Sequence, residues 1–163
     1  ALVRAEQAEG KIDSALSNVE LLLREDPTKR EYLETAADLE IARYLGNRSY
    51  LNELGPQKGL AYLHRLLESG GESQAQVYRK IAYVYVAERD YQTALSYLEQ
   101  AAERATQEGK EAFPADHLWI EAAEIALRMP ELQKAQDYAR KALASNSTSH
   151  AAKRILQQLS PLR

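Results

Sequence analysis

The stretch YRKIAYVYVAERDYQTALSYLEQAA, residues 78–102, decides the fold class of this chain. Its apolar residues recur three and four positions apart, which is the spacing of one face of an α-helix. These positions are Tyr78, Ile81, Ala82 and Tyr85 in the first half and Ala94, Leu95, Leu98, Ala101 and Ala102 in the second. Asp90 divides the halves and can cap a helix that begins at Tyr91. The stretch therefore predicts two amphipathic helices joined by a tight turn.

The rest of the 163-residue chain has the same helical character. It holds only 7 Gly and 5 Pro, and the residues between these breakers are mostly strong helix formers. No segment shows the sustained polar–apolar alternation of a β-strand. Ser147 can cap the last helix. We predict an all-α fold, with helices near residues 1–9, 11–25, 29–45, 57–69, 73–89, 91–108, 115–128, 131–145 and 149–159.

The composition is that of a folded protein and excludes several kinds of site and partner. Hydrophobic residues make up 45% of the chain and charged residues 28%, which is ordinary for a folded protein. The net charge of −3 gives no global reason to expect a nucleic-acid partner, and the short apolar stretches predict no membrane segment in this chain. With no cysteine, disulfides and thiolate metal sites are excluded. Because the chain starts at Ala1 and not at Met, we expect a fragment or a processed product.

The second helices of successive predicted pairs match one another in one frame. Each carries a small residue followed by apolar or small residues four and seven positions later. The small residues are Ala15, Gly59, Ala94 and Ala135, and the later matches are Val19, Leu63, Leu98 and Ala139, then Leu22, Leu66, Ala101 and Ala142. The small residues lie 44, 35 and 41 residues apart. One of these spacings is close to a period of about 34 residues, and the others need insertions.

The first helices complete the pattern of an aromatic, two small or apolar residues and a second aromatic. The third pair gives Tyr78, Ile81, Ala82 and Tyr85. The fourth gives Trp119, Ala122 and Ala123, with Ala126 in place of the second aromatic. On these residues the chain resembles a tetratricopeptide repeat (TPR) solenoid. The resemblance implies a right-handed superhelix of antiparallel helix pairs. In it, the small Ala82, Ala94, Ala123 and Ala135 would lie at helix crossings, and Tyr78, Tyr85, Leu98 and Trp119 would fill the spaces between them.

The repeat frame also sets the expected units and their insertions. We expect a partial repeat at 1–27, a degenerate repeat at 28–71 with an insertion at 44–55, repeats at 72–108 and 115–147, and a capping helix at 148–163. The insertion at 44–55 fits either a longer helix or a loop, and residues 46–55 could contact a partner. A second insertion around 106–114 lengthens the link between the third and fourth pairs. Tolerated lengthening of surface connections is the simpler interpretation of both.

Nothing in the sequence has the pattern of a catalytic or metal site. His64, His117 and His150 lie in three different predicted units, and none has metal-ligand spacing to another. Phosphate-binding glycine loops and nucleophile motifs are absent from the sequence. We therefore expect no enzyme activity, no catalytic residues, no metal and no cofactor.

The resemblance does imply a place for a partner, because first helices of TPR proteins line the inner, concave surface. The residues at these inner positions are Glu34 and Asp38, Arg79 and Tyr83, and Ile120 and Glu124. Family members that clamp a peptide carboxylate use Lys and Asn there, and only Arg79 has a suitable charge here. We therefore expect a groove that binds a partner protein or peptide of basic or mixed charge.

The charge along the chain is uneven. Residues 128–163 hold seven basic and two acidic side chains, whereas the preceding residues carry a net charge of −8. Basic residues near helix C-termini complement the helix dipole, which explains this pattern without a partner. The alternative is an end-on contact with an acidic protein or with the acidic flank of a second copy.

Two function classes follow from the pattern. The first is a non-catalytic protein-interaction scaffold. The second rests on the degenerate, insertion-bearing units and on residues 39–46, LEIARYLG, which resemble TPR scaffolds of bacterial exopolysaccharide export outer-membrane proteins. That resemblance implies a periplasmic segment that docks a polysaccharide-modifying enzyme or guides the polysaccharide itself. A cytoplasmic location is expected otherwise, and the oligomeric state is open.

Overall fold

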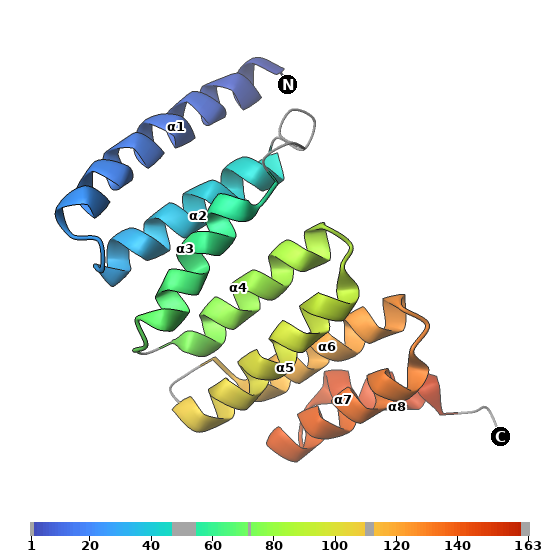
Figure 1. The fold of residues 1–163 in the computed structure, drawn as a ribbon. Coiled ribbons are helices and arrows are strands. Elements are labelled where there is room, and N and C mark those ends of the chain that lie inside the picture. The colour runs from blue at the N-terminus through green and yellow to red at the C-terminus, as the bar shows by residue number, and fades with distance from the viewer. Residues whose placement is uncertain (1, 47–54, 72, 110–112, 161–163) are drawn as a thin grey trace. The chain divides into compact units, whose positions relative to one another are not determined.

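The computed structural model describes residues 2–46, 55–71, 73–109 and 113–160. All regular secondary structure in these ranges is helical, as Figure 1 shows. The helices are α1 (Leu2–Glu25), α2 (Arg30–Gly46), α3 (Gln57–Glu68), α4 (Gln74–Ala87), α5 (Tyr91–Glu108), α6 (Ala115–Arg128), α7 (Leu132–Ser145) and α8 (His150–Leu159). The predicted all-α class is confirmed.

The chain divides into two compact units, Ala1–Gly70 with α1 to α3 and Gly71–Arg163 with α4 to α8. In the first unit, α2 packs between α1 and α3. In the second unit each helix packs against the next, and α8 also touches α6. Consecutive helices run antiparallel in each unit (Figure 1).

The N-terminal helix departs from the prediction. The sequence indicated two helices, at 1–9 and 11–25, whereas the structure has one continuous helix, Leu2–Glu25. A lone glycine in a helix costs only about 1 kcal/mol relative to alanine, and Gly10 has helix formers on both sides. The predicted first helix at 1–9 is therefore wrong as a separate element.

Register along α1 also differs from the repeat frame. The predicted packing position Leu22 is exposed, whereas its neighbour Leu23 is buried. Leu16, Val19 and Leu23 form the buried stripe of this helix, with the three- and four-residue spacing of one face. The frame taken from the later repeats is therefore one residue out at the end of α1.

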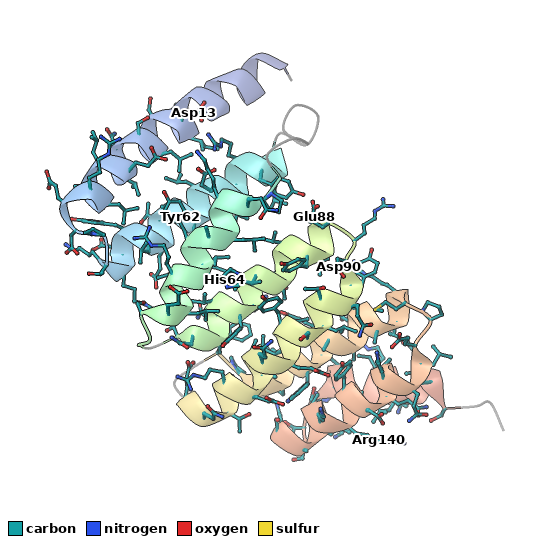
Figure 2. The ribbon with its side chains drawn as sticks, in the orientation of Figure 1. Asp13, Tyr62, His64, Glu88, Asp90 and Arg140 are labelled. Atoms are coloured by element: carbon teal, nitrogen blue, oxygen red, sulfur yellow. The ribbon has the colours of Figure 1, made fainter. Side chains whose placement is uncertain are left out.

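Helix starts show which polar side chains act as caps. The carboxylate of Asp90 accepts a hydrogen bond from the Thr93 backbone N–H at 3.1 Å, as predicted; Figure 2 labels Asp90 in the connection from α4 to α5. The cap of α8 is Ser149, whose hydroxyl oxygen accepts from the Ala152 N–H, and not the predicted Ser147. The last helix begins at His150, so Ser147 lies too far upstream to reach its first free N–H groups.

In two helix pairs, a hydrogen bond joins the end of the second helix to the start of the first helix. In the first unit, Arg30 Nη1 donates to the carbonyl oxygen of Gly70 at 2.7 Å. In the second unit, Glu108 Oε1 accepts from the backbone N–H groups of Gln74 at 2.8 Å and Ala75 at 3.4 Å. These contacts satisfy backbone groups that a helix end leaves open.

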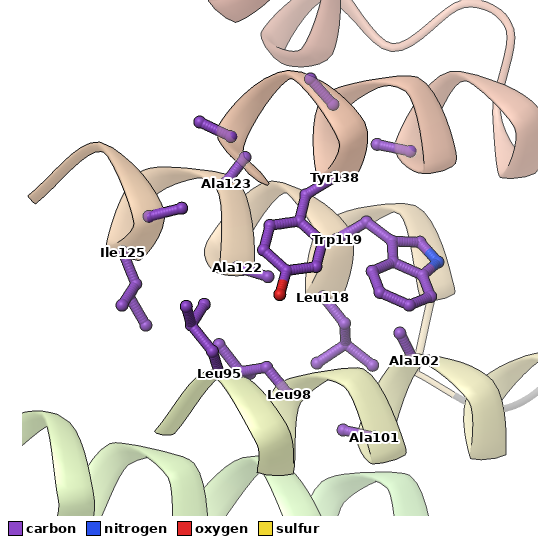
Figure 3. Close-up of a cluster of buried hydrophobic side chains, with 14 of the residues drawn as sticks. Leu95, Leu98, Ala101, Ala102, Leu118, Trp119, Ala122, Ala123, Ile125 and Tyr138 are labelled. Atoms are coloured by element: carbon purple, nitrogen blue, oxygen red, sulfur yellow. The ribbon is translucent and has the colours of Figure 1, made fainter. Parts of the chain in front are cut away.

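The core of the second unit combines small and aromatic side chains, as Figure 3 shows. The alanines at the expected crossings, Ala82, Ala94, Ala123 and Ala135, are all buried, as is Leu98. The ring of Trp119 on α6 stacks on Tyr138 of α7 with 6.0 Å between centroids. Tyr78 and Tyr85 are half-buried, and each packs against the ring of Tyr97 on α5.

The close approach of α2 and α3 in the first unit depends on Gly59. A Cβ atom at this position would lie 2.9 Å from Ile41 Cγ1, which is closer than two carbon atoms can pack. Glycine therefore stands where the repeat frame expects alanine. The residues of the predicted insertion at 44–46 form the last turn of α2, and 47–54 lie outside the described residues.

Candidate protein-interaction face

Arg79 joins the two first helices of the second unit. It lies on α4, and its Nη2 and Nε donate to the Glu121 carboxylate on α6, with Nη2 2.7 Å from Oε1 and Nε 3.0 Å from Oε2. The guanidinium fork matches the two carboxylate oxygens, which is the strongest geometry for such a pair. Its positive charge is therefore matched within the unit.

Two aromatic rings enclose the same guanidinium. Its Cζ lies 4.8 Å from the ring centroid of Tyr83 and 4.6 Å from that of Phe113, both within range of a cation–π interaction. Arg79 Nη2 also donates to the Tyr83 hydroxyl oxygen at 2.9 Å. The ring of His117 meets Phe113 edge-on at 6.1 Å. We call Arg79, Tyr83, Phe113, His117 and Glu121 the Arg79 cluster.

The protonation states of the cluster follow from these contacts. The hydrogen bonds to Glu121 raise the pKa of Arg79, against the opposing effect of burial. Burial, followed by the negative charge of Glu121, raises the pKa of Tyr83, although the Arg79 charge opposes this. Tyr83 therefore keeps its proton at neutral pH. With 46% of its surface exposed, it presents a neutral phenol to solvent.

The structure separates the six predicted partner-contacting residues. It brings only Arg79 and Tyr83 into the cluster. Ile120 is half-buried and packs against the core of the second unit, whereas Glu124 is exposed on α6, three residues after Glu121.

The remaining two, Glu34 and Asp38, belong to the first unit. Both lie on α2, where Glu34 pairs with Arg30 Nε at 2.8 Å and Asp38 is exposed. Their partner contacts stay a prediction.

Sequence reasoning missed the two residues that hold Arg79 in place. Glu121 was not among the predicted contact residues, and Phe113 lay in the insertion predicted around 106–114. One feature of the sequence could have indicated the pair: Arg79 and Glu121 are a base and an acid 42 residues apart, near one repeat length, on two consecutive first helices. Because the repeat spacing varies along this chain, that signal does not fix a register.

The described part of the chain offers no cluster of three His, Asp or Glu side chains that could hold a metal ion. Among the described helices, none combines the length and apolar character needed to cross a bilayer. The three histidines lie on three different helices, α3, α6 and α8.

The fold is similar to that of two proteins of known structure. No protein-family profile and no curated protein matches the chain. The crystal structure of MamA is similar, with a TM-score of 0.65 and 16% identity over 94% of this chain and 80% of that one. The crystal structure of BtubC from P. vanneervenii is also similar, with a TM-score of 0.62 and 14% identity over 95% of this chain and 64% of that one. The chain thus has the all-α, TPR-like solenoid fold of MamA.

Proposed function

We propose that this chain is a non-catalytic scaffold that binds a partner protein through the face of the second unit that carries the Arg79 cluster. Similarity to TPR-like solenoids supports a scaffold, although a fold does not by itself define a function. The observation that carries the proposal is the exposed Tyr83 ring, which the hydrogen bond and the ring contact of Arg79 hold in one orientation.

A fixed aromatic side chain suits a binding surface. Tyr has few rotatable bonds and a large contact area, and it is enriched among residues that dominate interface energies. Ordering a free side chain on binding costs about 0.5–1.5 kcal/mol, and a ring that is already held avoids most of this cost. Tyr83 is therefore a preorganised contact.

The charge around Tyr83 indicates the chemistry of the partner. Because Glu121 neutralises Arg79, the face does not offer a free cation for a carboxylate terminus. Glu124 adds an exposed acid on α6. A segment with an apolar or aromatic side chain and a basic flank fits this face better than an acidic one. Glu34 and Asp38 are proposed as a separate acidic contact in the first unit.

The polysaccharide-export role is the alternative proposal, and the aromatic residues do not favour it. A sugar-guiding surface needs exposed aromatic rings in a row, since carbohydrates stack on their faces. Trp119 and Tyr138 are both buried and stack on each other. Among the described aromatic residues of the second unit, Tyr83 alone has a largely exposed side chain.

A cross-linked pull-down from the source cells tests the scaffold proposal. The baits are the wild type, a double variant with Arg79→Glu and Tyr83→Ala, and a control with Arg140→Glu and Leu132→Ala. The control applies the same two kinds of change to exposed residues of α7 in the same unit. Circular dichroism checks that all three are helical.

We expect one protein to be captured by the wild type and the control and lost with the Arg79/Tyr83 variant. Capture that survives in that variant would exclude this face. Retention of polysaccharide with no protein captured would favour the export alternative.

A further inference from the structure

Helix α1 packs against α2 through one side, and its other side is exposed to solvent (Figure 1). The buried stripe consists of Leu16, Val19 and Leu23. Away from this stripe lie two adjacent leucines with large exposed fractions, 57% for Leu21 and 38% for Leu22. Single exposed leucines are ordinary on a protein surface, whereas neighbouring ones form an apolar patch that another surface can cover.

A regular line of exposed positions runs along α1 through this patch. Its residues follow one another at intervals of three, four, three and four positions, so they lie on one face of the helix. They are Lys11, Ser14, Asn18, Leu21 and Glu25, and all five are exposed. This spacing is that of the seam between two helices that pack side by side. We call these five residues the α1 stripe.

The α1 stripe is complementary in charge to its own reversed copy. It begins with a base, Lys11, and ends with an acid, Glu25, and Asn18 lies midway between them. If two copies of α1 pack antiparallel about a two-fold axis at Asn18, each Lys11 faces Glu25 of the second copy. A parallel arrangement would place each of these charges opposite a like charge, which is unfavourable. Charge therefore favours the antiparallel arrangement.

The residues between the two charges fit the same arrangement. Leu21 falls opposite Ser14 of the second copy, and on the other side of the seam Leu22 falls opposite Ala15 of that copy. A large side chain can enter the space that a small one leaves. The two Asn18 side chains meet at the axis, where each amide can donate to the carbonyl oxygen of the other. A polar residue such as asparagine in a helix seam fixes the register of the two helices.

We propose that the α1 stripe binds the α1 stripe of a second copy of this chain in an antiparallel, two-fold symmetric dimer. The overlap runs from residue 11 to residue 25 and spans about 21 Å. One helix pair of this length buries less than the roughly 1,600 Å² of a standard interface, so we expect a weak dimer with a dissociation constant on the order of 10–100 µM. The contact belongs to the first unit, whereas Tyr83 belongs to the second, so the dimer does not depend on the proposed scaffold face.

Sedimentation equilibrium of the pure protein, at concentrations between about 1 and 500 µM, tests the dimer. The buffer has low ionic strength, because salt screens exposed ion pairs. We expect a reversible equilibrium between monomer and dimer. A protein that stays monomeric at every concentration would overturn the proposal and leave the α1 stripe to a helix of a different protein.

Two variants that each reverse one charge test the predicted pairing. Lys11→Glu places two acids opposite each other at both ends of the contact, and Glu25→Lys places two bases there. Each variant alone should dimerise about tenfold more weakly than the wild type, or weaker still. Lys58→Glu reverses an exposed charge on α3 and is the matched control, which should dimerise like the wild type. Single variants that dimerise as tightly as the wild type would contradict the antiparallel pairing.

An equimolar mixture of the Lys11→Glu and Glu25→Lys proteins gives the sharpest test. In a mixed dimer, the acid introduced at position 11 faces the base introduced at position 25, and the unchanged Lys11 faces the unchanged Glu25. Both ends therefore carry opposite charges again, and we expect the mixture to dimerise about as tightly as the wild type. A variant that had lost its fold could not be restored by mixing. A mixture that dimerises as weakly as the single variants would overturn the proposal.

Discussion

Arg79 Nη2 and Glu121 Oε1 lie 2.7 Å apart and tie α4 to α6, the first helices of two consecutive pairs. Their side chains are 31% and 21% exposed, so the ion pair is partly buried. The pair has two consequences. It couples two repeats of the second unit. It also neutralises the charge of Arg79, so that the exposed group on this face is the Tyr83 ring.

The coupling can be measured by a double-mutant cycle with Arg79→Gln and Glu121→Gln. Because the pair is bidentate and partly buried, we expect each single variant to lose about 1 kcal/mol of unfolding free energy. The double variant should lose less than the sum, with a coupling of about 0.5–1 kcal/mol. Urea denaturation provides the values. Strict additivity would show that the two side chains do not interact in solution.

Glu108 should stabilise the start of α4. Ser73, the N-cap residue of this helix, makes no capping hydrogen bond, and the Glu108 carboxylate accepts from the first N–H groups instead. Glu108→Ala should therefore lower the unfolding free energy by about 1 kcal/mol. Glu103→Ala, at an exposed position of the same helix α5, is the matched control and should change stability little. Equal effects of the two variants would rule out a capping role.

Two glycine-to-alanine variants of the first unit should have opposite effects. Gly10 lies within α1 with no atom near its missing Cβ, so Gly10→Ala should stabilise the protein by about 0.5–1 kcal/mol. At Gly59 the new Cβ would press on Ile41, and Gly59→Ala should destabilise it by about 1–3 kcal/mol. Thermal or urea unfolding gives both values. A stabilised Gly59→Ala would mean that α2 and α3 are not so close.

Tyr138 should make the protein sensitive to alkali. Burial, and then the 2.6 Å hydrogen bond to Glu99 Oε1, raise the pKa of Tyr138 above its ordinary value of 10.0. Above about pH 10 the unfolded chain therefore loses the phenol proton while the folded chain keeps it. The unfolding free energy then falls as pH rises, and below pH 10 the group contributes no slope.

Urea unfolding of the wild type and of Tyr138→Phe between about pH 9 and 11 checks this sign. The slope above pH 10 should be smaller in the variant, although not zero, because burial also raises the pKa of Tyr62, Tyr83 and Tyr97. An unchanged slope would show that Tyr138 ionises equally in both states.

Much of the helical framework could be predicted from the sequence, because it depends on local features. The predicted bounds of α5 and α6 agree with the structure, since Asp90 and Pro114 mark their starts. The break at Gly10 was wrong for a physical reason: one glycine costs too little to end a helix without a proline or a capping residue beside it.

The candidate site was harder to predict from the sequence than the helices were. Tyr83 and Arg79 follow from the repeat frame, but Glu121 and Phe113 lie 42 and 34 residues beyond Arg79. Their contacts depend on the register of successive repeats, which unequal insertions obscure. The hydrogen bond between Asp116 and Asn146 was equally hard to predict, because it joins residues at the start of α6 and just after α7 that are 30 positions apart in the sequence.

Site-specific photocross-linking tests the central claim most directly. The photoreactive residue p-benzoylphenylalanine replaces Tyr83 in one sample and Leu132, an exposed residue of α7 in the same unit, in the other. After illumination in the source cells, we predict a covalent adduct with one protein from position 83 that is absent from position 132. The same adducts from both positions, or none from position 83, would contradict the claim that the Tyr83 face binds a partner protein.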